Sequence, residues 1–108
     1  MPKKQDPASL RRSARVNVRI PVTISGTLPD HQPFTEDTFV VTVSKYGAKL
    51  QTRQPLKVGM KVKLKPHSRR ESGLFKVVWM GREGSPRQGE VGIEYLEVFN
   101  LLGIAFPE

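Results

Sequence analysis

Two short stretches of the sequence carry groups that could bind an anionic nucleotide. The segment LRRSAR places the guanidinium groups of Arg11, Arg12 and Arg15 within five residues. The segment SKYG, about thirty residues later, combines the hydroxyl of Ser44 with Gly47, which can adopt positive φ and lets a ligand or a neighbouring strand approach the backbone. A guanidinium can grip a phosphate with two hydrogen bonds, stack on a base, or donate to O6 and N7 of guanine. Together the stretches suit a ligand that has both phosphates and purine edges.

At this spacing the two stretches resemble the paired motifs of the PilZ domain, a bacterial receptor for cyclic di-GMP. The first motif of that family is Arg-x-x-x-Arg, which Arg11 and Arg15 match. The second is an Asp or Asn, then Ser at the second position after it, then Gly three further on. Ser44 and Gly47 match this motif, and Thr42 occupies the place of the Asp or Asn. The resemblance implies that these residues bind cyclic di-GMP, with Arg12 in a supporting or solvent-exposed role.

The departure at Thr42 bears on the expected affinity. A carboxylate or amide there could accept the N1–H and N2–H of guanine together, whereas a Thr hydroxyl accepts at most one and carries no charge. Losing one charge-assisted hydrogen bond costs about 1–3 kcal/mol, or about ten- to a hundredfold in affinity. We therefore expect binding in the micromolar range or weaker. Thr is also a good strand residue, so strand propensity alone could explain its presence.

The composition excludes several kinds of site. With 108 residues the chain is long enough for one domain with a modest core, and it has no Cys to form a disulfide, a thiolate metal site or a nucleophile. Its only imidazoles, His31 and His67, do not lie in a spaced cluster with carboxylates. Ser44 has no His at a suggestive position, and no carboxylate pair stands out. We therefore expect a non-enzyme without a metal or a resident cofactor.

The charge distribution points to an anionic partner. The net charge is +8, and residues 57–87 hold nine basic groups against two acidic ones, whereas residues 88–108 hold four Glu and no basic residue. This asymmetry favours a nucleotide, a nucleic acid or a membrane surface as partner. The plain alternative is a self-repelling surface without a specific partner. No apolar run reaches the roughly 18 residues of a spanning helix, and the start lacks an apolar signal core, so we expect a cytoplasmic protein without membrane insertion.

The chain reads as a short arm followed by one domain. Residues 1–9 contain two Pro, several charges and no large apolar side chain beyond Met1, which predicts a disordered arm before a single domain over residues 10–108. Short apolar runs of strand character follow, broken by turn signals. They lie at residues 15–24, 39–43, 48–50, 60–65, 74–80 and 91–95, with a loop or long hairpin connection expected at residues 26–37. Pro21 lacks a ladder donor and predicts an edge position or a bulge.

Six strands in roughly 90 residues predict a small closed antiparallel β-barrel, because a flat sheet of that size would leave long unprotected edges. The PilZ resemblance covers roughly residues 10–96 and independently implies a six-stranded barrel. The only segment that favours a helical turn is residues 97–102, which we expect to cover one barrel end.

A basic stripe of lysines indicates an alternative function. Lys61, Lys63 and Lys65 alternate with apolar residues, and such a stripe on a barrel suits single-stranded nucleic acid when aromatic side chains lie beside it. Most aromatic residues, Trp79 among them, lie where we expect core. Tyr46 is the one plausible exposed platform.

The sequence therefore favours a non-enzymatic receptor or adaptor for cyclic di-GMP, or a degenerate PilZ-like barrel that has kept the fold and lost tight binding. In the receptor, the flexible arm that holds Arg11 and Arg15 folds over the barrel face near Ser44 and Gly47, with the ligand between arm and barrel. The new surface signals to an unidentified protein partner. The alternative is a small basic β-barrel that binds RNA or single-stranded DNA. A third possibility is an interaction module whose basic face meets an acidic protein. For the receptor, we expect only unspecific association with nucleic acid.

Overall fold

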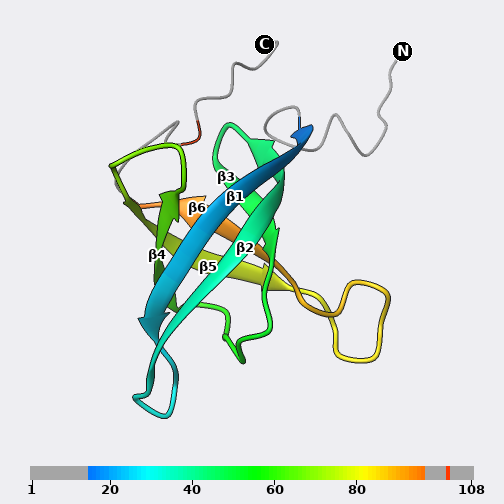
Figure 1. The fold of residues 1–108 in the computed structure, drawn as a ribbon. Helices are drawn as coiled ribbons and strands as arrows, with labels where there is room; N and C mark the ends of the chain where they lie inside the picture. Colours follow the sequence, from blue (N-terminus) through cyan, green and yellow to red (C-terminus); the bar gives the residue numbers. More distant parts are fainter. Residues whose placement is uncertain (1–14, 97–101, 103–108) are drawn as a thin grey trace, which may run out of the picture.

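The computed structural model of the chain describes residues 15–96 and Leu102. Its six strands are β1 (Arg15–Thr27), β2 (Pro33–Ser44), β3 (Gly47–Gln51), β4 (Lys61–Pro66), β5 (Gly73–Met80) and β6 (Glu90–Tyr95). All strand pairs are antiparallel, and the order β1-β2-β3-β6-β5-β4 closes on itself where β4 pairs with β1 (Figure 1). The predicted six-stranded antiparallel barrel is confirmed.

Some of the sequence predictions concern segments that are not described. The predicted arm at residues 1–9, together with Arg11 and Arg12, lies outside the described residues. The predicted helical turn at residues 97–102 also lies outside them, except for Leu102, which is buried in the core cluster. Within the part of the chain that is described, no helix is long and apolar enough to cross a bilayer.

Alternating side chains fill the barrel. In β4, Val62 and Leu64 are buried whereas the three lysines between and beside them are exposed. Burying a Val or Leu side chain stabilises a fold by about 1.5–3 kcal/mol, so each strand gains by turning its apolar face inward. Phe75 and Tyr95 meet in this core with ring centroids 4.8 Å apart. The interior is thus packed with side chains, and any ligand must bind on the outer face or at an end.

The first hairpin corrects one expectation. Residues 26–37, expected as a loop or long connection, are mostly strand, because β1 runs to Thr27 and β2 begins at Pro33. Phe34 lies opposite Gly26 in the register and is buried, and its ring fills the space that a side chain at position 26 would take. The burial of this ring favours a paired strand where the local Gly and Pro residues predicted none.

Register shifts in β1, β2 and β5 decide which residues face outward. In β2 the shift lies between Val40 and Thr42, so Val40 and Val43 are both buried while the two residues between them are only partly buried. In β1 the shift lies between Asn17 and Ile20, next to Pro21, for which an edge position or a bulge was expected, and Pro21 itself pairs in register with Phe39. A β-bulge of this kind inserts one extra residue and reverses the alternation beyond it. The shift in β5 changes which side chains line the candidate site and is described there.

Candidate functional site

A groove of about 510 Å³ crosses the outer face of β2, β3, β6 and β5. Among the residues that line it are four of the six predicted from the sequence, namely Arg15, Thr42, Ser44 and Gly47. The remaining two, Arg11 and Arg12, lie outside the described residues. The structure therefore brings the start of β1 and the β2–β3 turn onto one surface. Their role in binding stays a prediction.

The pairing of β1 with β2 explains why the two motifs meet. The strands run antiparallel with Arg15 directly opposite Ser44, so the first residue of β1 lies beside the last residue of β2. Arg15 is exposed at this position, and as the first residue of β1 it belongs to the barrel and not to the arm that was expected to hold it. Its guanidinium can therefore reach an anion in the groove without first losing a buried contact.

The hydroxyl of Ser44 is held loosely in the turn. Its Oγ accepts the backbone N–H of Tyr46 at 3.4 Å and donates to the carbonyl oxygen of Gly47 at 3.5 Å. Both contacts are at the long end of hydrogen-bond range and are correspondingly weak. A phosphate or a base edge could therefore compete for this hydroxyl at small cost. Tyr46, predicted as a platform, also lines the groove and is partly buried.

Gly47 has a structural role that is visible in the fold. A Cβ at this position would lie 1.9 Å from the carbonyl oxygen of Ile93 and 2.9 Å from Cα of Glu94. The φ angle of Gly47 is not positive. The close approach that Gly47 permits in this structure is therefore that of strand β6, and left-handed turn geometry is not what requires it.

The groove contains one carboxylate among its described lining residues, although position 42 has none. Thr42 faces the groove from β2, opposite Lys49 of β3, which forms an ion pair of 3.5 Å with Glu90. Glu94 of β6 lies opposite Gly47 and lines the same groove. A carboxylate can accept both N–H groups on the Watson–Crick edge of guanine. The groove thus combines cationic, hydroxyl and carboxylate groups.

Trp79 lines the groove, and its predicted core position is wrong. Strict alternation from Phe75 through Val77 would turn Trp79 inward, but the register shift between Val77 and Trp79 leaves Val78 as an extra residue. As a result Val78 and Trp79 are both outward, and Trp79 is 38% exposed. The only sequence signal was the unique Trp itself, because nothing local marks the bulge.

Arg87 is a further groove residue that the sequence analysis missed. It belongs to the loop of residues 81–89 between β5 and β6, and its Cζ lies over the Trp79 ring, 6.0 Å from the ring centroid. The loop folds back at Gly81, where an added Cβ would lie 1.7 Å from the carbonyl oxygen of Arg87. No spacing in the sequence connects Arg87 with the two motifs, since the loop conformation alone brings it to the groove.

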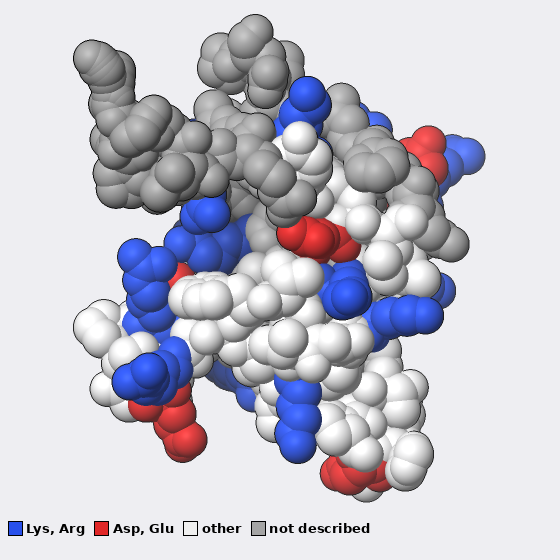
Figure 2. Space-filling view, turned by 180° about the vertical axis from the view of Figure 1, so that it is seen from behind, with Lys and Arg blue, Asp and Glu red and all other residues white. Residues whose placement is uncertain are grey.

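The lysine stripe lies on β4, a strand that contributes nothing to the groove. Its three lysines are exposed as predicted, and their partners on the adjacent strands are Leu74 and Lys76 of β5 and Thr23 and Ser25 of β1. None of these partners is aromatic. Lys and Arg side chains are also spread over much of the face shown in Figure 2. The basic charge is therefore distributed, and the described stripe has no stacking ring paired with it.

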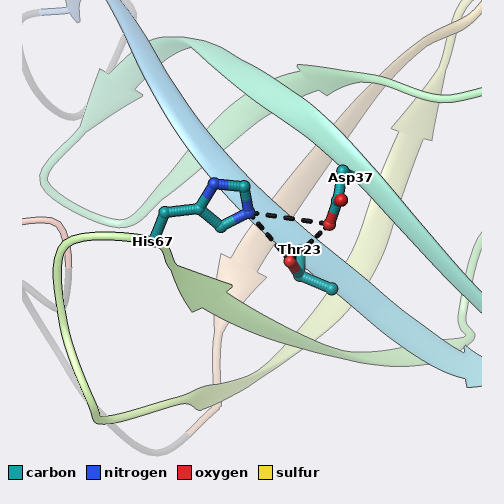
Figure 3. Close-up of polar contacts among 3 residues, drawn as sticks. All are labelled: Thr23, Asp37 and His67. Carbon is teal, nitrogen blue, oxygen red and sulfur yellow. Dashed lines mark hydrogen bonds and ion pairs between the residues drawn. The ribbon is translucent and has the colours of Figure 1, made fainter.

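A separate polar cluster on the outer surface joins Thr23, Asp37 and His67 (Figure 3). The Thr23 hydroxyl donates to Oδ1 of Asp37 at 2.6 Å, and Nε2 of His67 lies 2.9 Å from the same hydroxyl and 3.6 Å from the same Oδ1. The hydrogen bond from Thr23 holds the pKa of Asp37 below its usual value, with desolvation opposing this effect and the neighbouring His67 adding to it. This cluster lies outside the groove lining.

The same atoms decide what this cluster can do. A hydroxyl has one proton, and Thr23 gives it to Asp37, so Nε2 of His67 acts as the donor toward Thr23. In a nucleophilic relay the imidazole would instead accept the hydroxyl proton while the carboxylate held the other ring nitrogen. The geometry is that of a surface link between β1, β2 and the turn after β4.

The comparisons with known proteins give a fold and no family assignment. No protein-family model and no curated protein matches the chain. Among solved structures, the chain is similar to that of the Bacillus subtilis inhibitor of motility (MotI/DgrA), with a TM-score of 0.60 and 15% sequence identity. The match covers 82% of this chain and 43% of that chain, so this chain spans less than half of its neighbour. At such identity the likeness shows a shared fold.

Proposed function

We propose that the chain is a non-enzymatic receptor for cyclic di-GMP that binds the ligand in this groove and signals through a protein partner. The observation that carries the proposal is the meeting of Arg15, Thr42, Ser44 and Gly47 along one groove. These residues come from the two stretches that resemble the PilZ motifs, and the barrel agrees with the fold that this resemblance implies.

The groove fits the chemistry of this ligand. Cyclic di-GMP carries two phosphates and two guanines, and small-molecule sites usually measure about 300–1,000 Å³, a range that contains the 510 Å³ of the groove. Arg15 can bind a phosphate or the O6 and N7 atoms of guanine. Ser44 supplies a weakly engaged hydroxyl, and Glu94 supplies a carboxylate for the opposite edge of the base.

The length of the chain between Arg11 and Arg15 would allow Arg11 to contribute to the site. Arg11 precedes Arg15 by four residues, and an extended chain spans at most about 3.6 Å per residue, so their Cα atoms lie within about 14 Å of each other. Unliganded, the clustered arginines repel one another. Ligand phosphates would neutralise this repulsion and fix the arm against the barrel, which is a known kind of order–disorder switch. The surface formed in this way is what a protein partner would recognise.

Nucleic-acid binding is the weaker candidate. Proteins that bind single strands place aromatic rings beside the basic groove so that successive bases can stack. The described lysines of β4 lack such rings among their cross-strand partners. We therefore expect this surface to attract nucleic acid only through its charge.

Isothermal titration calorimetry with cyclic di-GMP tests the proposal. Wild-type protein should bind in the micromolar range or weaker, and Arg15→Ala should bind at least about tenfold more weakly, because it removes a charged hydrogen-bonding group from the groove. Arg19→Ala is the matched control, since Arg19 lies on the same strand, over Phe39 at 3.9 Å, and does not line the groove. It should bind within about threefold of wild type. Equal affinity of the Arg15 variant and wild type would refute the site, and absence of binding at millimolar ligand would refute the function.

Limited trypsin digestion tests the arm separately. Saturating cyclic di-GMP should slow cleavage after Arg11 and Arg12, because a closed arm is a poor protease substrate. Equal cleavage rates at verified saturation would leave binding intact and refute arm closure.

A further inference from the structure

We infer that Trp79 and Arg87 form a clamp for one purine base of the ligand, with the indole ring on one face of the base and the guanidinium on the other. The inference rests on the proposed function, because it assigns the base-binding part of the same groove.

The position of Trp79 is built by its neighbours. The bulge in β5 turns the side chain outward, and Gly92 lies directly opposite on β6. A Cβ at position 92 would lie 3.4 Å from Cβ of Trp79 and 3.8 Å from the ring atom Cε3. Because Gly92 has no side chain, the indole can lie across β6 along the groove. The ring is thus supported from one side and 38% exposed, which is what a stacking platform requires.

The distance between Arg87 and the ring is the second observation. A guanidinium in direct contact with an aromatic ring lies as close as Arg19 does to Phe39, where Cζ is 3.9 Å from the centroid. Arg87 stays 6.0 Å from the Trp79 centroid. Stacked groups are separated by about 3.5 Å, so a base held between two of them needs about 7 Å. The existing gap is therefore too wide for direct stacking and needs to open by only about 1 Å to admit a base.

The loop that carries Arg87 is held by its own hydrogen bonds. The N–H of Gly84 donates to Oε1 of Gln88 at 2.8 Å, and the N–H of Arg87 donates to Oγ of Ser85 at 3.2 Å. The carbonyl oxygen of Arg87 accepts the N–H of Glu90 at 3.0 Å. These bonds hold the backbone at Arg87. Its long side chain is exposed, so it can move by the small amount that a base requires.

The clamp is accessible to a direct measurement because Trp79 is the only tryptophan of the chain. Titration with cyclic di-GMP, and separately with GMP, should quench its fluorescence saturably. With cyclic di-GMP the midpoint should equal the affinity measured by calorimetry. Trp79→Ala should weaken binding by at least about tenfold, which is within the range found for base–aromatic stacking. Trp79→Phe keeps an aromatic face and should stay within about fivefold of wild type.

Two variants in one loop test the other half of the clamp. Arg87→Ala should weaken cyclic di-GMP binding by about three- to tenfold, because it removes the cation above the base. Arg82→Ala removes the same charge from an exposed residue of the same loop that does not line the groove, so it should bind like wild type. Circular dichroism of each variant checks that the barrel is intact. If Trp79→Ala does not fold, the quenching and Arg87→Ala still decide the matter.

The outcomes separate the clamp from the receptor. If calorimetry shows binding of cyclic di-GMP but the fluorescence of Trp79 is not quenched, the clamp is overturned and the receptor remains. The same holds if the folded Trp79→Ala and Arg87→Ala variants bind cyclic di-GMP with unchanged affinity. Saturable quenching by GMP without binding of cyclic di-GMP would overturn the receptor ligand and support a clamp for purine nucleotides. No response to either nucleotide would overturn both.

Discussion

Replacing Gly47 with Ala should destabilise the barrel by about 2–5 kcal/mol. The added Cβ would lie 1.9 Å from the carbonyl oxygen of Ile93, whereas ordinary contacts begin near 3.4 Å. Strands β3 and β6 must therefore move apart locally by about 1.5 Å. The obstructing atoms belong to the backbone, so no side chain can rotate away. Overpacking costs about 1–3 kcal/mol, and one or two weakened inter-strand hydrogen bonds add about 1 kcal/mol each.

Urea unfolding followed by circular dichroism measures this effect. Gly84→Ala is the control, since Gly84 has a φ of +83° and no atom within 4 Å of its added Cβ, so only backbone strain of about 1–2 kcal/mol is expected. If Gly47→Ala were no more destabilised than Gly84→Ala, the strand-contact argument would be wrong. The result also bears on function. A loss of cyclic di-GMP binding in a Gly47 variant reports a disturbed groove and does not identify a ligand contact.

Three further predictions concern affinity, salt and pH. Thr42→Asp should tighten cyclic di-GMP binding by about tenfold in calorimetry, because a carboxylate accepts both donors of guanine, and unchanged or weaker binding would mean that position 42 does not meet the base. Raising salt from about 50 to about 200 mM should abolish oligonucleotide binding in fluorescence anisotropy but weaken cyclic di-GMP binding far less. A sequence-selective complex with an oligonucleotide that persists at the higher salt would favour the nucleic-acid alternative. Thr23→Val should lower stability toward urea at about pH 6. The native pKa of Asp37 is lowered, so ionised Asp37 contributes to the stability of the fold above the ordinary pKa of 3.8, and this contribution is lost as pH falls through the native pKa. The stability difference between Thr23→Val and wild type should therefore shrink in acid. A difference that stays constant with pH would contradict this assignment.

The barrel could be predicted from the sequence because the features that indicate its strands lie within short segments of the chain. Period-two alternation in segments such as residues 61–65 and 91–95 marks which face of each strand is apolar, and turn residues separate the strands. The closed form followed from the need to leave no exposed edges. Arg15, Ser44 and Gly47 were singled out in the sequence because their two stretches resemble the PilZ motifs, and the pairing of β1 with β2 brings them to one groove.

The tertiary structure decided which side chains complete that groove. Trp79 was expected inside because Phe75 and Val77 alternate toward it, and a single bulge against β6 reverses its direction. The register of a strand depends on the partner with which it pairs, and that partner lies elsewhere in the sequence. Arg87 reaches the groove only through the folded loop, and the surface link of Asp37 with His67 arises only where distant segments meet. The types of residues and their alternation can be recognised from neighbouring residues in the sequence, whereas bulges and loop conformations depend on packing against distant segments.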